Sequence, residues 1–367
     1  MALFNPIDAA LSAGQRIGRY FTLVSLIPAL LLVVWTYIVI ASGAPSERPA
    51  IRNVFTAFSH WSVGKVAGLV LATLAVALIL HPLQFAITQL LEGYWGTTPL
   101  ATAAMKLRIV HHRQRQRKLW YKATDSHDAW RGRCVELLQM DKDAGQNSQS
   151  LDERIDGLIA SERGDPFMLD VIAEQEALSQ HANNYPADPT RMMPTRLGNA
   201  LRRFEDSAGE QYGLNATLIA PHIHLVVPSR HLDYLIDTRQ AMDAAIRISA
   251  VGLIATALTA GLLLRDGIWL LWALVPYTIS YLAYRGAVSS AQSYGSVFAS
   301  VIDLDRFLLY KELGLSTPRD TDEERTNNAA LMELLAGGSG TISYRRENVG
   351  PEGTTPFPRR QRKPGNR

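Results

Sequence analysis

The chain has 367 residues, of which 47% are hydrophobic and 19% are charged, and its formal net charge is +3. Its mean hydropathy of -0.01 would suit a soluble protein, but the apolar residues are concentrated in a few long stretches. The single cysteine, Cys134, excludes an intramolecular disulfide and gives no sign of an oxidising compartment.

Four stretches contain no Asp, Glu, Lys or Arg: residues 20–46, 66–91, 248–264 and 267–284. Each contains, or nearly contains, the roughly 20 apolar residues that a helix needs to cross the hydrocarbon core of a bilayer. We therefore predict a mainly α-helical integral membrane protein with four transmembrane helices. They form two hairpins flanking a cytosolic helical domain with at most one or two short strands. The absence of formal charge from these stretches argues against an ion-coupled transporter.

Basic residues set the expected orientation. Arg16 and Arg19 precede the first span, and a basic segment without acidic residues follows the second span. Because cytosolic segments carry an excess of Lys and Arg, we expect the N-terminus and the middle region to lie in the cytosol. An even number of spans returns the C-terminus there too. The expected location is the cytoplasmic (inner) membrane of a bacterium.

The basic segment after the second span also predicts a binding partner. Basic residues just inside a membrane attract anionic lipids by about 1 kcal/mol each, so anionic lipid is the expected partner. Trp120 and Tyr121 could stack on nucleic-acid bases, but a site tethered to a membrane reaches little nucleic acid, and none is expected. The proposed lipid-interface residues are Lys106, Arg108, Arg113, Arg115, Arg117, Lys118 and Lys122.

The chain divides into four regions. Residues 1–95 are expected to form an N-terminal amphipathic helix and the first hairpin, and residues 96–228 the cytosolic helical domain. Residues 229–313 form the second hairpin with cytosolic helical extensions. Residues 314–367 form a short helix and a disordered basic tail, in which Gly, Pro and Arg dominate.

The expected cytosolic domain contains helix signals and one strand signal. Residues 100–140 predict one long charged helix, and shorter helices are expected at 151–163 and 166–182. Thr195 is a good N-cap for a further helix, because its hydroxyl can accept a hydrogen bond from the first turn. Residues 214–227 have strand composition and are the one good strand candidate.

The second hairpin is expected to continue into this domain. No proline interrupts residues 229–264, so we predict one helix that joins the cytosolic domain rigidly to the third span. After the fourth span the helix continues over residues 285–313, and a last helix is expected at 321–336. Small residues along one surface can let helices pack closely. They are Gly286, Ser290, Gly295 and Ala299.

Several short motifs resemble a known group of proteins. The chain reads Pro-Thr-Arg-Leu-Gly-Asn at 194–199, Tyr-Gly-Leu-Asn-Ala at 212–216, Leu-Leu-Glu-Gly-Tyr-Trp at 90–95 and Leu-Asp-Arg-Phe at 304–307. These motifs are similar to those of an uncharacterised family of actinobacterial multi-pass membrane proteins. In the family, an aromatic residue and a proline usually follow the second motif. This chain reads Ala220-Pro221 there, so it keeps the proline but not the aromatic residue. The resemblance implies a topology, and no activity, substrate or catalytic residue comes with it.

The sequence contains few candidate motifs for catalysis, cofactor binding or metal binding. His222 and His224 would share one face of a strand, with His231 nearby, a spacing that can chelate zinc. Apart from Asp233, no Cys, Asp or Glu is close enough in sequence to complete four ligands. His81 lies within a predicted span, and we interpret it as a neutral histidine bonded to a partner helix. The glycines at 337–340 lack the following lysine of a phosphate-binding loop. We assign no catalytic, cofactor-binding or metal-binding residue.

Three classes of function stay open. The leading hypothesis is a non-enzymatic scaffold or sensor that presents the helical domain at the inner leaflet and binds a protein partner or itself. The second is a homo-oligomeric pore or membrane-disrupting effector, suggested by a polar stripe of Gln84, Thr88 and Gln89. The third is an enzyme acting on lipid or envelope precursors, which a deep polar pocket at the inner interface would favour.

Overall fold

The computed structural model describes residues 25–44, 46–59, 61–140, 173–174, 176–178, 181 and 184–344. This part is mainly helical, as predicted, and its only β pairing is a bridge between Leu315 and Tyr344. Most of the residues predicted as the N-terminal amphipathic helix, the helices at 151–182 and the basic tail lie outside the described residues.

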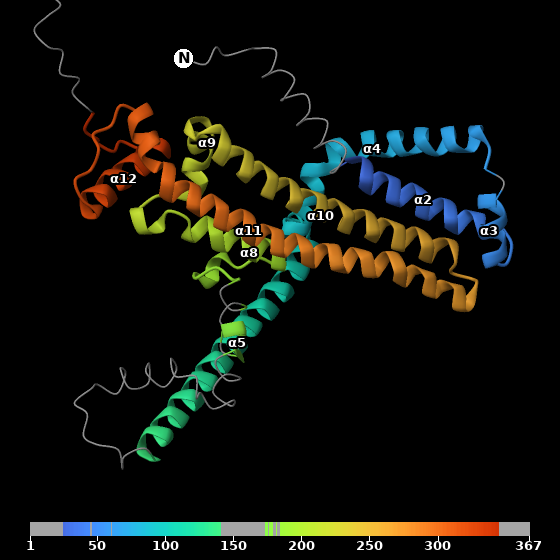
Figure 1. Ribbon diagram of the computed structural model, residues 1–367, viewed down its shortest axis with the longest axis horizontal. Helices are drawn as coiled ribbons and strands as arrows, with labels where there is room; N and C mark the ends of the chain where they lie inside the picture. The colour runs from blue at the N-terminus through green and yellow to red at the C-terminus, as the bar shows by residue number, and fades with distance from the viewer. Residues whose placement is uncertain are drawn as a thin grey trace, which may run out of the picture.

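Three helical segments are long and apolar enough to cross a membrane. They are Val63–Glu92 (α4), Ser229–Leu262 (α10), and Gly267–Glu312, which joins a 3₁₀ turn to α11 (Leu274–Glu312). The first predicted span corresponds to the shorter helix α2 (Ile27–Ala41), which packs against α4 and α10. Together these helices form the elongated bundle in Figure 1, with the short helix α3 (Ile51–Ser59) at its far end.

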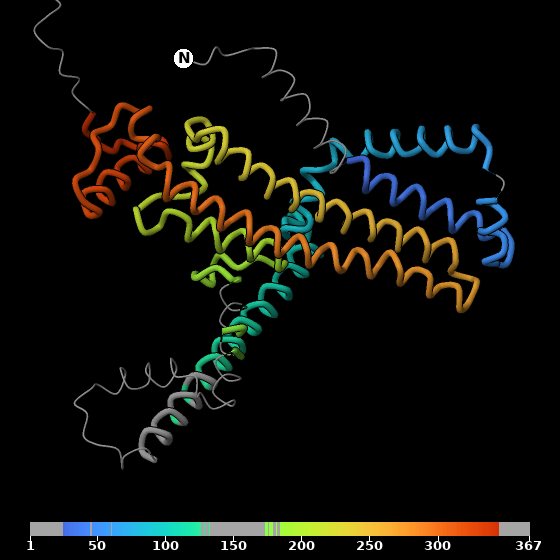
Figure 2. The backbone as a smooth tube through the Cα atoms, viewed as in Figure 1, coloured from blue at the N-terminus to red at the C-terminus, as the bar shows by residue number. Residues whose placement is uncertain are grey.

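Helices α10 and α11 form an antiparallel pair. Both helices extend well beyond the ends of α2 and α4 (Figure 2). The prediction of an unbroken helix from Ser229 is confirmed, because α10 continues to Leu262. A Cβ on Gly252 would lie 2.8 Å from Ser280 Cβ and 2.9 Å from the carbonyl oxygen of Pro276. Glycine therefore lets the two backbones approach closely, as small residues do between membrane helices.

A helical domain surrounds the other end of the α10–α11 pair. It contains α8 (Arg196–Ser207), α9 (Ala216–Val226) and α12 (Thr321–Leu335). The Thr195 side chain accepts a hydrogen bond from the amide of Gly198, which confirms the predicted N-cap of α8. A buried core joins α9, the end of α11 and α12.

The strand predicted at residues 214–227 is wrong, because this segment forms α9. The Asn215 side chain accepts hydrogen bonds from the amides of Thr217 and Leu218 and so begins the helix. Ile219 and Ile223 are fully buried at the four-residue spacing of one helix face. Tertiary burial on this face therefore overrides the strand propensity of the composition.

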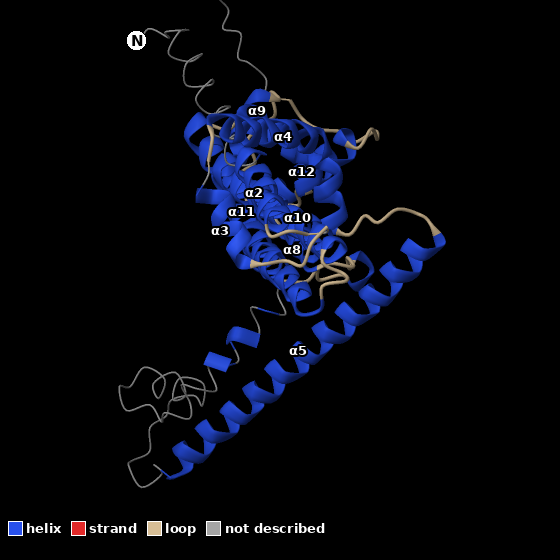
Figure 3. Cartoon of the chain, turned by 90° about the vertical axis from the view of Figure 1, so that its right-hand side faces the viewer, coloured by secondary structure: helices blue, strands red, loops and turns tan. Residues whose placement is uncertain are grey.

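Helix α5 (Pro99–Met140) leaves the rest of the molecule and confirms the long helix predicted at 100–140. Figures 1 and 3 show that it crosses obliquely beneath the bundle and projects away from it. Among its described side chains, those of His112 and Ala123 are buried against the body.

A basic helix face and an arginine-lined pocket

All seven proposed lipid-interface residues lie on α5, around an exposed apolar stripe. The stripe consists of Leu100, Leu107, Val110 and Tyr121, whose exposed fractions are 85%, 72%, 50% and 69%. Their spacing places them on one side of the helix, opposite His112 and Ala123. We call this surface the α5 stripe. Lysines and arginines flank it on both sides, which is the arrangement of a helix that lies on a membrane surface.

The opposite face of α5 is fixed to the body by aromatic and polar contacts. His112 Nδ1 lies 3.2 Å from the hydroxyl of Tyr185, and the two rings are in contact. Arg113 Nη2 donates a hydrogen bond of 2.8 Å to the carbonyl oxygen of Pro189. Burial, reinforced by Arg108 and other nearby cations, lowers the pKa of His112 to about 4. Burial raises the pKa of Tyr185. His112 is therefore neutral at physiological pH.

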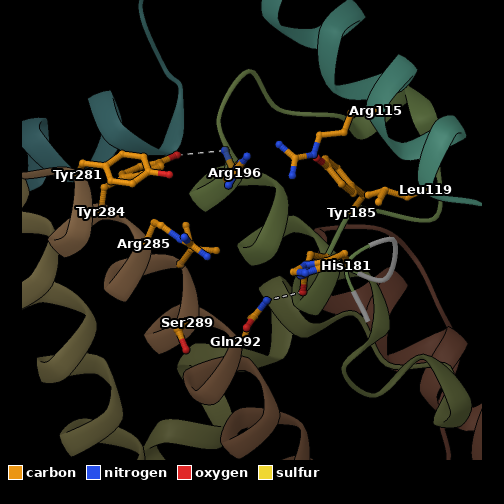
Figure 4. A pocket seen from close by; sticks show the side chains of 12 residues that line it. Arg115, Leu119, His181, Tyr185, Arg196, Tyr281, Tyr284, Arg285, Ser289 and Gln292 are labelled. Carbon is orange, nitrogen blue, oxygen red and sulfur yellow. Dashed lines mark hydrogen bonds between the residues drawn. The ribbon is translucent and has the colours of Figure 1, made fainter. Parts of the chain in front are cut away.

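Beside this contact lies a cavity of about 400 Å³, which we call the arginine pocket. Three arginines from separate parts of the chain enter it: Arg115 from α5, Arg196 from the start of α8 and Arg285 from α11. Figure 4 shows Arg115 and Arg285 pointing toward one another from opposite sides, with Arg196 between them. Among the lining residues that the structure describes there is no Asp or Glu.

Three tyrosines complete the polar wall of this pocket: Tyr185, Tyr281 and Tyr284. The Tyr284 hydroxyl oxygen accepts hydrogen bonds from the backbone amides of Arg196, at 3.1 Å, and Leu197, at 3.3 Å. Two amides at the N-terminus of α8 therefore fix this oxygen, and the phenolic proton stays available to an acceptor in the pocket.

A second polar cluster joins α4 to α10. Arg247, only 2% exposed, donates a hydrogen bond of 2.6 Å to Ser25 Oγ and another to Gln84 Oε1. Asp243, 6% exposed, lies one turn earlier on α10, and its Oδ1 is 3.5 Å from Arg239 Nε. The Gln84 side chain of the predicted polar stripe is thus engaged within the chain.

Of the small residues proposed for packing, Gly295 lies against α8 and Gly286 is exposed. A Cβ on Gly295 would come within 2.0 Å of the Phe204 ring, whereas nothing lies within 4 Å of such an atom at Gly286. Ser290 and Ala299 are partly buried. Whether any of these residues packs against another copy of the chain stays a prediction.

The histidines considered for a metal do not share one face. His222 and His224 lie two residues apart on α9, so their side chains point to different sides of a helix. His222 Nδ1 is 3.3 Å from the carbonyl oxygen of Leu218. Among the described residues there is no group of three or more His, Cys, Asp or Glu that could hold a metal ion.

Sequence reasoning found only one of the three pocket arginines, Arg115. Arg196 belonged to a motif without a known role, and Arg285 was only the first charge after the fourth uncharged stretch. The spacing of Tyr281, Tyr284 and Arg285 could have indicated a polar site, since residues three or four apart share a helix face.

Comparison of the chain with known protein families, curated proteins and solved structures finds no match. Its function must therefore be argued from its own residues.

Proposed function

We propose that this chain is a membrane-anchored interaction protein that holds a helical domain against the inner leaflet of a cytoplasmic membrane. In this proposal α2 and α4 form one transmembrane hairpin and α10 and α11 the other, with both termini and the helical domain in the cytosol. Support comes from the three membrane-length helices and from α2, which lies along two of them. The basic residues after α4 favour this orientation.

The single observation that carries the proposal is the α5 stripe. A soluble protein rarely leaves a row of large apolar side chains as exposed as Leu100 and Leu107. Helix α5 begins seven residues after α4 ends, so the stripe starts close to the proposed membrane surface. Basic residues along its edges complement anionic headgroups. We therefore propose that this face of α5 lies on anionic lipid.

The arginine pocket lends some support to the enzyme alternative, because such an enzyme would need a polar cavity near the membrane. Catalysis of proton transfer would also need a positioned acid or base. The described lining residues offer His181 for that role and no carboxylate. Binding, rather than chemistry, is therefore the function that we propose for this region.

Depth-dependent fluorescence quenching tests the contact between α5 and lipid. A probe is attached to a cysteine at Leu107, in a Cys134→Ser background, and the full chain is reconstituted in nanodiscs containing brominated anionic lipid. Leu304, on α11, is the matched control because its exposed fraction is 69%. We expect strong quenching at position 107 and little at 304. Equal and weak quenching at both positions would contradict the proposal.

A charge variant separates lipid attraction from simple proximity. Replacing Lys106, Arg117 and Lys118 by glutamine removes three charges from the edges of the α5 stripe. Quenching at position 107 should fall and become less sensitive to salt, since surface electrostatic attraction is screened by ions. Topology is tested independently by reporter fusions after Asp141 and at Arg367, both of which should be active in the cytosol.

A further inference from the structure

The strongest unexplained feature of the molecule is the charge of the arginine pocket. Folding brings Arg115, Arg196 and Arg285 to one cavity from positions far apart in the sequence. Their guanidinium groups form no ion pair with a described carboxylate. Like charges held together without a counter-charge repel one another, and the repulsion grows where protein replaces water. A bound anion would remove this cost.

We propose that the arginine pocket binds the phosphate group of a phosphorylated ligand. Guanidinium groups suit this role, because their planar donors match two phosphate oxygens at once. The Tyr284 hydroxyl, fixed by two amides of α8, adds a neutral donor. The positive end of the α8 dipole lies at the same place and favours negative charge.

The size and lining of the cavity indicate a ligand larger than inorganic phosphate. A volume of about 400 Å³ falls in the range of about 300–1,000 Å³ that is usual for small-molecule sites. Leu119 and Val288 add apolar surface to the wall. The pocket can therefore accommodate a phosphate together with an attached organic group, such as the glycerol of a phospholipid or of a soluble phosphate ester.

The location of the pocket bears on the source of this phosphate. Tyr281 and Tyr284 belong to the last turn of the uncharged stretch of α11, and Arg285 is the first charge after it. If the proposed topology holds, this level coincides with the headgroups of the inner leaflet. The preference for a lipid rests on the proposed function, whereas the preference for phosphate rests on the pocket alone.

Binding to the purified full-length chain tests the phosphate chemistry. One arm titrates glycerol 3-phosphate into the chain in neutral detergent and follows the midpoint of thermal unfolding, which a bound ligand raises. The other arm adds phosphatidylglycerol or, as the zwitterionic reference, phosphatidylcholine with the same acyl chains. Saturable stabilisation in the first arm identifies a soluble ester, and stabilisation by phosphatidylglycerol alone identifies a lipid. No stabilisation in either arm would overturn the proposal.

Variants connect this stabilisation to the pocket. Arg196→Gln with Arg285→Gln should weaken binding at least tenfold, and Arg285→Gln alone should weaken it less. Arg285 is exposed, so its substitution leaves folding intact. Lys311→Gln, at an exposed position of α11 outside the pocket, is the matched control and should leave the affinity unchanged. Equal affinities of the parent, the double variant and the control would overturn the proposal, while quenching at position 107 reports separately on the membrane contact of α5.

The unfolding midpoint of the ligand-free chain tests the argument from charge independently. If the arginines repel one another when the pocket is empty, Arg285→Gln should raise the unfolding midpoint of the ligand-free protein and lower the gain from added ligand. A lowered midpoint would show that Arg285 stabilises the empty fold, and this would contradict the argument from uncompensated charge.

Discussion

The α10–α11 pair is held together in a different way from the contact between the α2–α4 pair and α10. Helices α10 and α11 meet by close backbone approach at Gly252, and Ser280 Oγ donates a hydrogen bond of 2.7 Å to the carbonyl oxygen of Ser249. The first hairpin, α2 and α4, reaches α10 through apolar packing and through longer polar side chains. Arg247 donates hydrogen bonds to Gln84 and Ser25, and Trp35 Nε1 donates a hydrogen bond of 2.9 Å to Thr259 Oγ1.

The difference indicates which parts can move. A backbone contact built on small residues leaves little space for sliding, so α10 and α11 form one rigid spine from the bundle into the helical domain. The contacts of the first hairpin with α10 combine apolar side-chain packing with a few polar groups. Where α4 ends, Thr195 Oγ1 at the start of α8 donates a hydrogen bond of 2.6 Å to the carbonyl oxygen of Glu92. We expect the first hairpin to separate from the spine before the spine itself opens.

The largest expected effect comes from breaking the polar junction at Arg247. Replacing it by methionine keeps most of the side-chain volume but removes the donors to Ser25 and Gln84 and leaves Asp243 beside a neutral group. Loss of one member of a buried charged cluster costs about 3–5 kcal/mol. We expect a clear fall in the unfolding midpoint in detergent and faster hydrogen exchange in α4 than in α11.

Two further variants check this interpretation. Asp243→Asn added to Arg247→Met should recover part of the lost stability, because the buried carboxylate is then neutral. Arg265→Met, in the exposed connection between α10 and α11, should change stability by less than about 0.5 kcal/mol. Equal protection of α4 and α11 in Arg247→Met would show that the two hairpins open together.

A smaller effect is expected from enlarging the spine contact. A Cβ at position 252 would press on Ser280 and Pro276, and overpacking of this kind typically costs 1–3 kcal/mol. The matched control is Gly261→Ala on the same helix, where nothing lies within 4 Å of the added atom. Alanine should be neutral or stabilising there, because it favours helix by about 1 kcal/mol over glycine. A similar loss in both variants would refute the close-contact argument.

Periodicity and helix signals were enough to predict much of the fold. The long helices α5 and α10 follow from uninterrupted stretches without proline. Helix α8 begins after the predicted cap Thr195, and α12 begins at residue 321 as predicted. The strand prediction for residues 214–227 failed because the apolar residues there suit either a strand or a helix. Burial of Ile219 and Ile223 on one face favours the helix. That burial depends on α11 and α12, which are distant in sequence.

The candidate sites were predictable only in part. The basic residues of α5 form one segment, so sequence alone could propose them, but it could not tell which apolar residues of α5 stay exposed. Leu119 turns toward the arginine pocket while Leu107 is exposed. The pocket itself depends on three arginines spread over 171 residues, from 115 to 285, and only tertiary packing brings them together.

The smallest effect on stability at neutral pH is expected at the contact between α5 and the body. This contact involves a histidine, whereas the contacts between the hairpins named above do not. The pKa of His112 falls from 6.5 to about 4 on folding, first through burial and then through nearby cations, of which Arg108 contributes most. Above pH 6.5 the residue is neutral in both states and changes nothing. Between pH 6.5 and about 4 the unfolded chain binds the proton more readily, so stability declines as the pH falls.

Substitution at this position should flatten that decline. His112→Phe keeps a buried aromatic ring against Tyr185 but cannot titrate, so its unfolding midpoint should vary less between pH 7 and pH 5 than that of the parent chain. His224→Phe, at an exposed position on α9, is the matched control and should keep the parent's dependence. Hydrogen exchange locates the effect, since protection should decrease first around residues 184–193, which α5 contacts through Tyr185 and Pro189. If His224→Phe flattens the profile and His112→Phe does not, the pH dependence arises away from α5, and the docked face of α5 is insensitive to pH.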